Sequence, residues 1–308
     1  MDYKAYYIST YETLIRVKNM LNQMDTNYFT TTIINNKPLN NDTISIVMTA
    51  SNRSIQTYFT LDTINKSSYK NIQVILVDDS SDDPITIAKL NQYNMHIELI
   101  QIKNKFWINP CVNYNIGFKH VKGGKIIIQN AEVCHIGDVI QHVADTVENN
   151  NYYAFDVYAI RTINENNQLY DMEKLNTMVR QNIISLAGMW YQHPIHRNEA
   201  FHFLTSMTKH TFDKIEGFDI DYAMGVDYDD ADFLCRIRNN GIKIITITDT
   251  VMGVHQWHRQ SPFGSHGGKI SNSHIFSRKL NYINTNKSLL CLASYEKNDV
   301  VDIINKWI

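Results

Sequence analysis

The stretch Ile72-Gln-Val-Ile-Leu-Val77, followed directly by Asp78-Asp79-Ser80-Ser81, decides the fold class of this chain. Its β-branched, mostly apolar residues predict a buried strand, and the polar residues after it predict a turn. Upstream, Ile44-Ser-Ile-Val-Met-Thr49 has the same character, and residues 52–65 between the two runs predict a helix. A strand, a helix and a second strand in this order indicate a βαβ unit and a parallel sheet.

The alternation continues along the chain. We predict helices at 84–92 and Cys111–His120, and strands at His96–Ile102 and Lys125–Ile128. In open α/β sheets the ligand lies beyond the carboxyl ends of the strands. Polar clusters follow three of the predicted strands, at Thr49–Arg53, Asp78–Ser81 and Asn130–Glu132. The sequence therefore predicts a functional site at this edge of the sheet.

Three parts are expected along the chain. Residues 1–42 form an N-terminal helical extension, because apolar residues recur at helical spacing over 3–24. Residues 43–260 form the α/β domain, with halves at 43–140 and 141–260. A mobile loop rich in Ser, Gly and His, followed by helices, is expected over 261–308.

Composition excludes several classes of protein. With 29 Lys and Arg against 31 Asp and Glu, the chain lacks the basic excess of a sequence-independent polyanion binder, so no nucleic-acid partner is expected. The four cysteines are far apart and form no CxxC motif, which favours a reducing compartment. The N-terminus does not resemble a signal peptide, and no apolar run approaches the ~18 residues of a membrane span. We therefore expect a soluble, cytoplasmic protein without a transmembrane segment.

The strongest anomaly of composition is an acidic cluster. Six aspartates lie between Asp219 and Asp232, namely Asp219, Asp221, Asp227, Asp229, Asp230 and Asp232. Like charges this close raise one another's pKa and cost stability unless a cation or a chemical role offsets them. The alternative is a solvated loop and helix N-terminus, where Asp caps the helix and suits its dipole. Interleaved apolar residues favour a partly buried loop.

Other polar motifs suggest ligand chemistry. In Asp78-Asp79 one carboxylate could accept a hydrogen bond from the N–H of a nucleobase while the other caps the next helix. The alternative is that the two residues only cap the helix and form the turn. Asn130-Ala131-Glu132 offers oxygen ligands to a hard divalent cation. His255 and His258 flank Trp257 after a predicted strand, and either could be a functional or a structural histidine.

Taken in order, these motifs resemble a glycosyltransferase of the GT-A fold, and the nearest group is glycosyltransferase family 2. The resemblance covers roughly residues 43–260 and rests on the strand-end clusters above, together with Asn115, Gly117, Gly123 and Gly124. Downstream, Gly217-Phe-Asp219 and Tyr228–Arg236 resemble the acceptor-side segment of galactosyltransferases and polypeptide N-acetylgalactosaminyltransferases. The resemblance implies a Rossmann-like, mixed but mainly parallel sheet flanked by helices, with a nucleotide-sugar half (43–140) and an acceptor half (141–260).

The resemblance also implies roles on the donor side. Residues implied to bind a UDP-sugar are Thr49, Ser51, Arg53, Asp79, Asn109 and Asn130. The family's Asp-x-Asp motif falls on Asn130-Ala131-Glu132, so this chain departs from it. Gly253-Val-His255 matches the position of a metal-binding histidine in the family. Mn²⁺ or Mg²⁺ would therefore be coordinated by Glu132 and His255. Asp138 matches an acidic residue that the family pattern has downstream of the motif.

On the acceptor side the resemblance implies Asp230 as general base, with Asp229 beside it and Asp232 near the acceptor. Both neighbours would raise the pKa of Asp230. Trp190 and Trp257 could stack on sugar faces, the alternative being an aromatic core.

The predicted function is transfer of a hexosyl or N-acetylhexosaminyl group from a UDP-sugar to a hydroxyl of a glycan, glycolipid or protein, with inversion. An inactive binding module of the same fold is the alternative, motivated by the altered Asp-x-Asp motif. A nucleotidyltransferase ranks last, because residues 48–52 contain no glycine for a phosphate loop. The terminal helices could also form a homo-oligomer.

Overall fold

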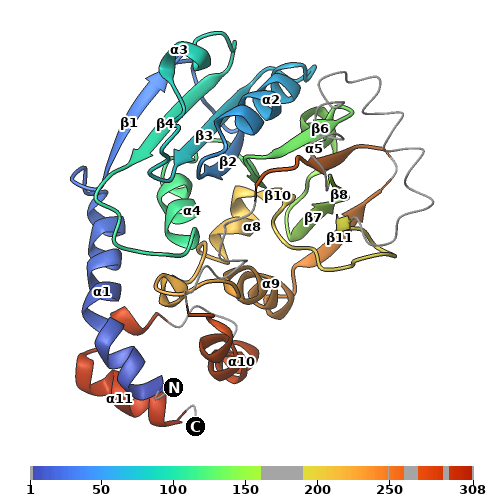
Figure 1. Cartoon of the computed structure of the whole chain (residues 1–308). Coiled ribbons are helices and arrows are strands. Elements are labelled where there is room, and N and C mark those ends of the chain that lie inside the picture. Colours follow the sequence, from blue (N-terminus) through green and yellow to red (C-terminus); the bar gives the residue numbers. More distant parts are fainter. Residues whose placement is uncertain (1–2, 161–189, 249, 260–269, 287–290, 307–308) are drawn as a thin grey trace.

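The computed structural model describes residues 3–160, 190–248, 250–259, 270–286 and 291–306. Two sheets form the centre, and helices cover them (Figure 1). The larger sheet has the spatial order β1 (Phe29–Ile34), β4 (His96–Ile102), β3 (Ile72–Asp78), β2 (Ile44–Ala50), β5 (Lys125–Asn130), β10 (Leu204–Thr208), β7 (Asn151–Phe155) and β11 (Lys243–Ile247). The smaller sheet has the order β6 (Val133–Ile136), β12 (Met252–His255), β8 (Val157–Ala159) and β9 (Trp190–Gln192).

The large sheet is mixed and mainly parallel, as predicted. β4, β3, β2 and β5 run parallel to one another, and β11 runs parallel to β7. β1 is antiparallel to β4, and β10 is antiparallel to both β5 and β7. The predicted fold class is confirmed.

Helices lie on both faces of this sheet. The helices of the described residues are α1 (Tyr3–Gln23), α2 (Ser54–Asn65), α3 (Ile87–Leu90), α4 (Cys111–Phe118), α5 (Val139–Thr146), α8 (Lys209–Asp213), α9 (Asp229–Asn239), α10 (Ser273–Asn286) and α11 (Lys297–Lys306), with 3₁₀ turns η1 (Ile220–Tyr222) and η2 (Leu292–Ser294). One core joins α1, α4 and α9 to one face, and a second core joins α2 and α5 to the other. Because both faces are buried, the central strands are almost continuously apolar.

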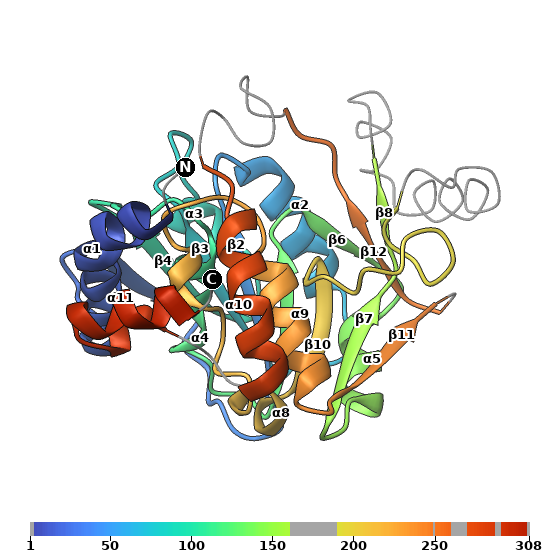
Figure 2. The ribbon, with the colours of Figure 1, turned by 90° about the horizontal axis from the view of Figure 1, so that it is seen from below.

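A glycine explains how closely one helix approaches the sheet. A Cβ atom at Gly117 of α4 would lie 2.7 Å from Val47 Cγ1 of β2, so a larger residue would push the helix away. The terminal helices α1 and α11 pack against each other beside the sheet domain, and α10 lies along α9 (Figure 2).

Several predicted elements differ in detail. The N-terminal part, predicted as helical, also contributes the edge strand β1. The helix predicted over 84–92 is the single turn α3. The strands β7 and β8 follow each other along the chain but belong to different sheets. The predicted mobile loop falls mostly on 260–269, outside the described residues. None of the described helices carries an apolar stretch long enough to cross a bilayer.

Candidate active site

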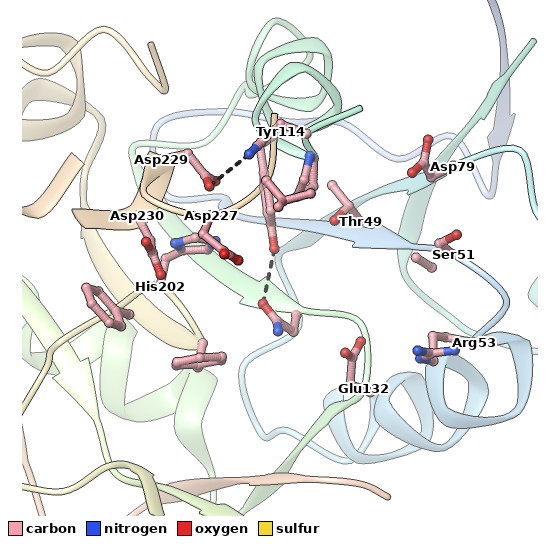
Figure 3. A pocket seen from close by; sticks show the side chains of 17 residues that line it. Thr49, Ser51, Arg53, Asp79, Tyr114, Glu132, His202, Asp227, Asp229 and Asp230 are labelled. Carbon is pink, nitrogen blue, oxygen red and sulfur yellow. Dashed lines mark hydrogen bonds between the residues drawn. The ribbon is translucent and has the colours of Figure 1, made fainter. Parts of the chain in front are cut away.

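A cavity of about 550 Å³ opens at the carboxyl ends of β2, β3 and β5 and faces the N-terminus of α9 (Figure 3). It is lined by nine of the residues to which the resemblance assigned a role: Thr49, Ser51, Arg53, Asp79, Asn109, Asn130, Glu132, Asp229 and Asp230. The nine lie far apart in the sequence. Parallel strands that end at one edge bring most of them together, as expected for an open α/β sheet.

The two acids at the carboxyl end of β3 have different partners. Asp78 is buried and accepts hydrogen bonds from the backbone N–H groups of Ser81 and Ile85, so it fixes the loop after the strand. Asp79 lines the cavity, and its Oδ2 receives Lys105 Nζ at 2.6 Å. Asp79 Oδ1 is buried and has no hydrogen-bond partner among the described residues. An acceptor in this state is suited to a donor N–H of a ligand.

Glu132 lies in the turn between β5 and β6, and β12 brings two histidines to it. Because β12 pairs antiparallel with β6, His255 stands opposite Val133, the residue after Glu132. His255 Nε2 lies 3.4 Å and His258 Nε2 lies 3.5 Å from Glu132 Oε1. Burial alone would raise the pKa of Glu132, but the hydrogen bond from His255 and the charges of both histidines lower it to about 2.

These three side chains could hold a metal ion. One ligand atom from each of Glu132, His255 and His258 lies within 4.8 Å of the others, a spacing that suits a shared cation. Two imidazoles and one carboxylate form a donor set typical of transition metals such as Mn²⁺ rather than of Mg²⁺. The sequence predicted Glu132 and His255 as metal ligands, and the structure places His258 beside them.

The side chain of Gln256 fixes this turn. Its Nε2 donates to the carbonyl oxygens of Glu132 and Gln56 and to Thr60 Oγ1, and its backbone N–H also donates to Glu132 O. Sequence reasoning missed Gln256, because its partners are distant in the sequence.

Asp227, Asp229 and Asp230 enter the cavity from the start of α9. Asp227 and Tyr228 have φ values of 65° and 66°, a left-handed pair that turns the chain into the helix. Asp229 is buried and receives Asn109 Nδ2 at 3.1 Å. Asn109 also accepts a hydrogen bond from the Cys111 N–H at 2.8 Å. Asn109, which was predicted to bind the UDP-sugar, therefore positions Asp229.

The pKa values of these acids are raised. Burial is the largest cause for Asp229, followed by the charge of Asp230, and together they raise its pKa to about 7. Burial also raises the pKa of Asp230, the Ala231 N–H opposes that rise, and the charge of Asp227 adds to it. A carboxylate with a raised pKa is a stronger base toward an acceptor hydroxyl.

Tyr114 and His202 are cavity residues that sequence reasoning missed. Tyr114 is buried in α4 and donates to Gln129 O at 3.0 Å, with Asn130 Oδ1 at 3.4 Å. His202 packs edge-on against Tyr114, and burial lowers its pKa to about 4. His202 is therefore neutral near pH 7. No motif surrounds either residue, so the sequence offered no signal for them.

The acidic cluster divides into two groups, and this corrects the prediction for Asp232. Asp232 is fully buried and pairs with Arg236, N to O at 2.8 Å, so it packs α9 and does not line the cavity. Asp219 and Asp221 pair with the fully buried Lys279 of α10. Internal cations thus stabilise these three acids, and only Asp227, Asp229 and Asp230 face the site. Asp227, not Asp232, is the neighbouring acid that raises the pKa of Asp230.

Trp190 and Trp257 line a second cavity of about 580 Å³, together with His255 and His258. Trp190 is almost fully buried and packs edge-on against Tyr158, so most of its surface belongs to an aromatic core.

The predicted downstream acid, Asp138, caps α5 by accepting a hydrogen bond from the Gln141 N–H, and it also accepts hydrogen bonds from Ser67 and Ser68.

Comparison with known proteins identifies the family. A family model described as glycosyl transferase family 2 matches residues 45–212, more than half of the chain. The chain belongs to glycosyl transferase family 2. The matched range contains Asp79 and Glu132, whereas Asp230 and His255 lie beyond it. No curated protein matches the chain.

Solved structures show that this family 2 chain has the GT-A fold. Its fold is similar to that of S. aureus TarS, with a TM-score of 0.55, 12% identity, and coverage of 86% of this chain and 42% of that one. TarS 1-349 in complex with UDP-GlcNAc matches with a TM-score of 0.52 and 12% identity over 86% of this chain and 71% of the other. The chain therefore spans less than half of the first of these TarS structures. The likeness of the acceptor-side segment to galactosyltransferases stays a prediction.

Proposed function

We propose that this family 2 protein transfers a hexosyl or N-acetylhexosaminyl group from a UDP-sugar to a hydroxyl of a glycan, glycolipid or protein, with inversion and with a divalent metal. One observation carries the proposal. A single cavity holds three acids with different properties. Asp79 has an oxygen without a hydrogen-bond partner among the described residues, Glu132 belongs to the candidate metal site formed with His255 and His258, and Asp230 has a raised pKa.

On the donor side, Asp79 Oδ1 would accept the N–H of the uracil ring while Lys105 holds the other oxygen. Thr49 and Ser51 line the cavity beside it and would meet the ribose, and Arg53 would meet a phosphate. The fold shared with TarS 1-349, whose structure contains UDP-GlcNAc, supports this assignment.

Glu132, His255 and His258 would hold the metal, and a bound divalent cation neutralises the charge that develops on the departing diphosphate. Asn130 stands where the family motif has an aspartate, and because it is neutral it adds no negative charge beside these three residues. The metal site therefore rests on residues from two elements, the β5–β6 turn and the end of β12.

In the transfer step, Asp230 takes the proton of the acceptor hydroxyl. The acceptor oxygen forms a bond to the anomeric carbon as the bond from that carbon to the diphosphate oxygen breaks, and UDP leaves. One displacement from the face opposite the leaving group inverts the anomeric configuration. Positioning and charge stabilisation in a desolvated site supply the rate enhancement.

Donor turnover tests the proposed function. The full chain is incubated with UDP-glucose, UDP-galactose, UDP-GlcNAc or UDP-GalNAc and Mn²⁺, and UDP release and UDP affinity are measured. We expect UDP release with at least one donor. UDP binding without release or transfer would support the inactive binding module, and absence of UDP binding would contradict both.

The metal site gives a separate prediction. His258→Ala removes one of the three ligands, so the Kd for Mn²⁺ without nucleotide should rise by more than the roughly 10- to 100-fold that loss of an outer-shell partner costs. Calorimetric titration measures the Kd, and Mn²⁺ should bind more tightly than Mg²⁺ to the unmodified protein. His210→Ala, at an exposed histidine of α8, is the control. An unchanged Mn²⁺ affinity in His258→Ala would exclude this ligand set.

The raised pKa of Asp230 gives a pH dependence. A base is inactive when protonated, so activity should fall as the pH drops through the pKa of Asp230. Because the charge of Asp227 raises that pKa, Asp227→Asn should lower it and move the acid limb of the kcat profile to lower pH. Asparagine tolerates the left-handed backbone at this position.

The matched control is Asp213→Asn, which removes an exposed acid from α8. Its acid limb should coincide with that of the unmodified protein. A limb that stays in place in Asp227→Asn, or moves to higher pH, would mean that Asp230 is not the titrating base.

A further inference from the structure

A second cavity adjoins the first and has the opposite charge. Glu132 of the first cavity lies within 3.5 Å of His255 and His258, which line the second. Phe203 of the first also packs at a tilt against Tyr191 of the second, with ring centroids 4.6 Å apart. The two cavities therefore share a wall.

Of the described residues that line the two cavities, all the acidic ones line the first. The first cavity is lined by Asp79, Glu132, Asp227, Asp229 and Asp230, with Arg53 as the cation. The described lining of the second cavity contains Arg197 and Arg259 and no Asp or Glu. Neither arginine forms an ion pair with a described carboxylate. A cationic, aromatic-walled cavity attracts an anionic ligand.

Arg197 is held by its surroundings. Its backbone N–H and carbonyl both pair with His193, at 3.0 and 2.9 Å. Its guanidinium lies 5.6 Å from the ring centre of Tyr191. An arginine held in this way loses less side-chain entropy when it binds a carboxylate or phosphate.

Burial raises the pKa of Asp230, and the charge of Arg197, which lines the second cavity, opposes that rise. A ligand group beside Arg197 is thus within electrostatic range of Asp230. The aromatic ring of Trp257 supplies an apolar surface against which a sugar ring can pack.

We propose that the second cavity binds the acceptor, and that the acceptor is a sugar that carries a carboxylate or phosphate group, recognised by Arg197 and Arg259. The assignment rests on the proposed function, because it places the acceptor hydroxyl toward Asp230. It narrows the acceptor class from any hydroxyl-bearing glycan to an anionic one.

Binding of matched sugars tests the proposal without requiring turnover. Glucuronate and glucose 6-phosphate are each compared with glucose by tryptophan fluorescence, since two of the four tryptophans line this cavity. The full chain is used with UDP and Mn²⁺ present. A charge-assisted contact to one arginine corresponds to about tenfold in Kd, so both anionic sugars should bind at least about tenfold more tightly than glucose.

Two variants and a control identify the residues. Arg197→Gln and Arg259→Gln should each remove most of the preference for the anionic sugars and leave the Kd for UDP unchanged. Arg238→Gln, at an exposed arginine of α9 outside both cavities, should keep the preference.

Two outcomes would overturn the inference. Equal affinity for glucose and both anionic sugars would show that the cavity does not select charge. A raised Kd for UDP in the arginine variants, with sugar binding unchanged, would show that the arginines serve the donor diphosphate. Anionic sugar binding that depends on both arginines would support this site even if no UDP-sugar is turned over, so its failure is distinguishable from that of the proposed function.

Discussion

Asp230→Asn is expected to lower kcat by about 10²- to 10⁴-fold, the range over which a positioned general base contributes. Asparagine keeps the size of the side chain and cannot take the acceptor proton. Asp230 lies at the start of α9, on a different element from Asp79 and Glu132 (Figure 3), so the Kd for UDP should change little. Initial rates at saturating donor measure the first effect, and calorimetry with UDP measures the second.

The control for Asp230→Asn is Asp213→Asn on α8, which should keep its kcat because this acid lies outside the cavity and is more than half exposed. Thermal unfolding of both variants shows whether the fold is intact. Retained turnover in a folded Asp230→Asn protein would reject Asp230 as the base. Lost UDP affinity with normal turnover per bound donor would place Asp230 in donor binding instead.

Lys279→Met is expected to cost roughly 3–5 kcal/mol of unfolding free energy, the usual result of removing one partner from a buried ionic cluster. Lys279 is fully buried in α10 and meets the carboxylates of Asp219 and Asp221, so methionine leaves two buried acids without their cation. Burial already raises the pKa of Asp219 to about 7, and Lys279 opposes that rise. Urea unfolding at equilibrium measures the loss.

The effect of Lys279→Met should depend on pH. Without Lys279 the folded-state pKa of both acids rises further above the unfolded value. Stability is then highest when these acids are protonated and falls as pH rises through the folded pKa, so the loss should be smaller at about pH 5 than at about pH 8. Lys297→Met, which breaks an exposed pair with Glu12, should cost within about 1 kcal/mol. Equal costs in the two variants would contradict a structural role for the buried cluster.

The central strands could be predicted because their signal is local. In β2 and β3 almost every residue is buried, and a continuous β-branched run shows this without knowledge of the partner strand. The edge strand β1 gave no such signal. Its threonines are largely exposed, and it is a strand only because it pairs with β4, far along the chain.

The acidic cluster shows the limit of sequence reasoning within one segment. Its excess of negative charge indicated that a cation or a functional role must offset the repulsion. In the structure part of the cluster pairs with buried cations and the other part lines the cavity. Buried cations hold Asp219, Asp221 and Asp232, whereas the cavity receives Asp227, Asp229 and Asp230. Neighbours in the sequence have opposite environments. The turn η1 places Asp219 and Asp221 beside Lys279, and within α9 Asp232 pairs with Arg236, whereas Asp229 and Asp230 line the cavity.

The sequence by itself determined the parallel strands, the edge of the sheet where the site lies, and most of the residues around it. These follow from apolar runs and from the polar residues that end them, which are properties of neighbouring positions. Only the tertiary structure decided that His258 joins His255 beside Glu132, because that meeting depends on β12 pairing with β6. It also decided which acids face the cavity and that Arg197 and Arg259 share a second one. Such contacts join residues far apart in the chain, and their register is set by the packing of the whole fold.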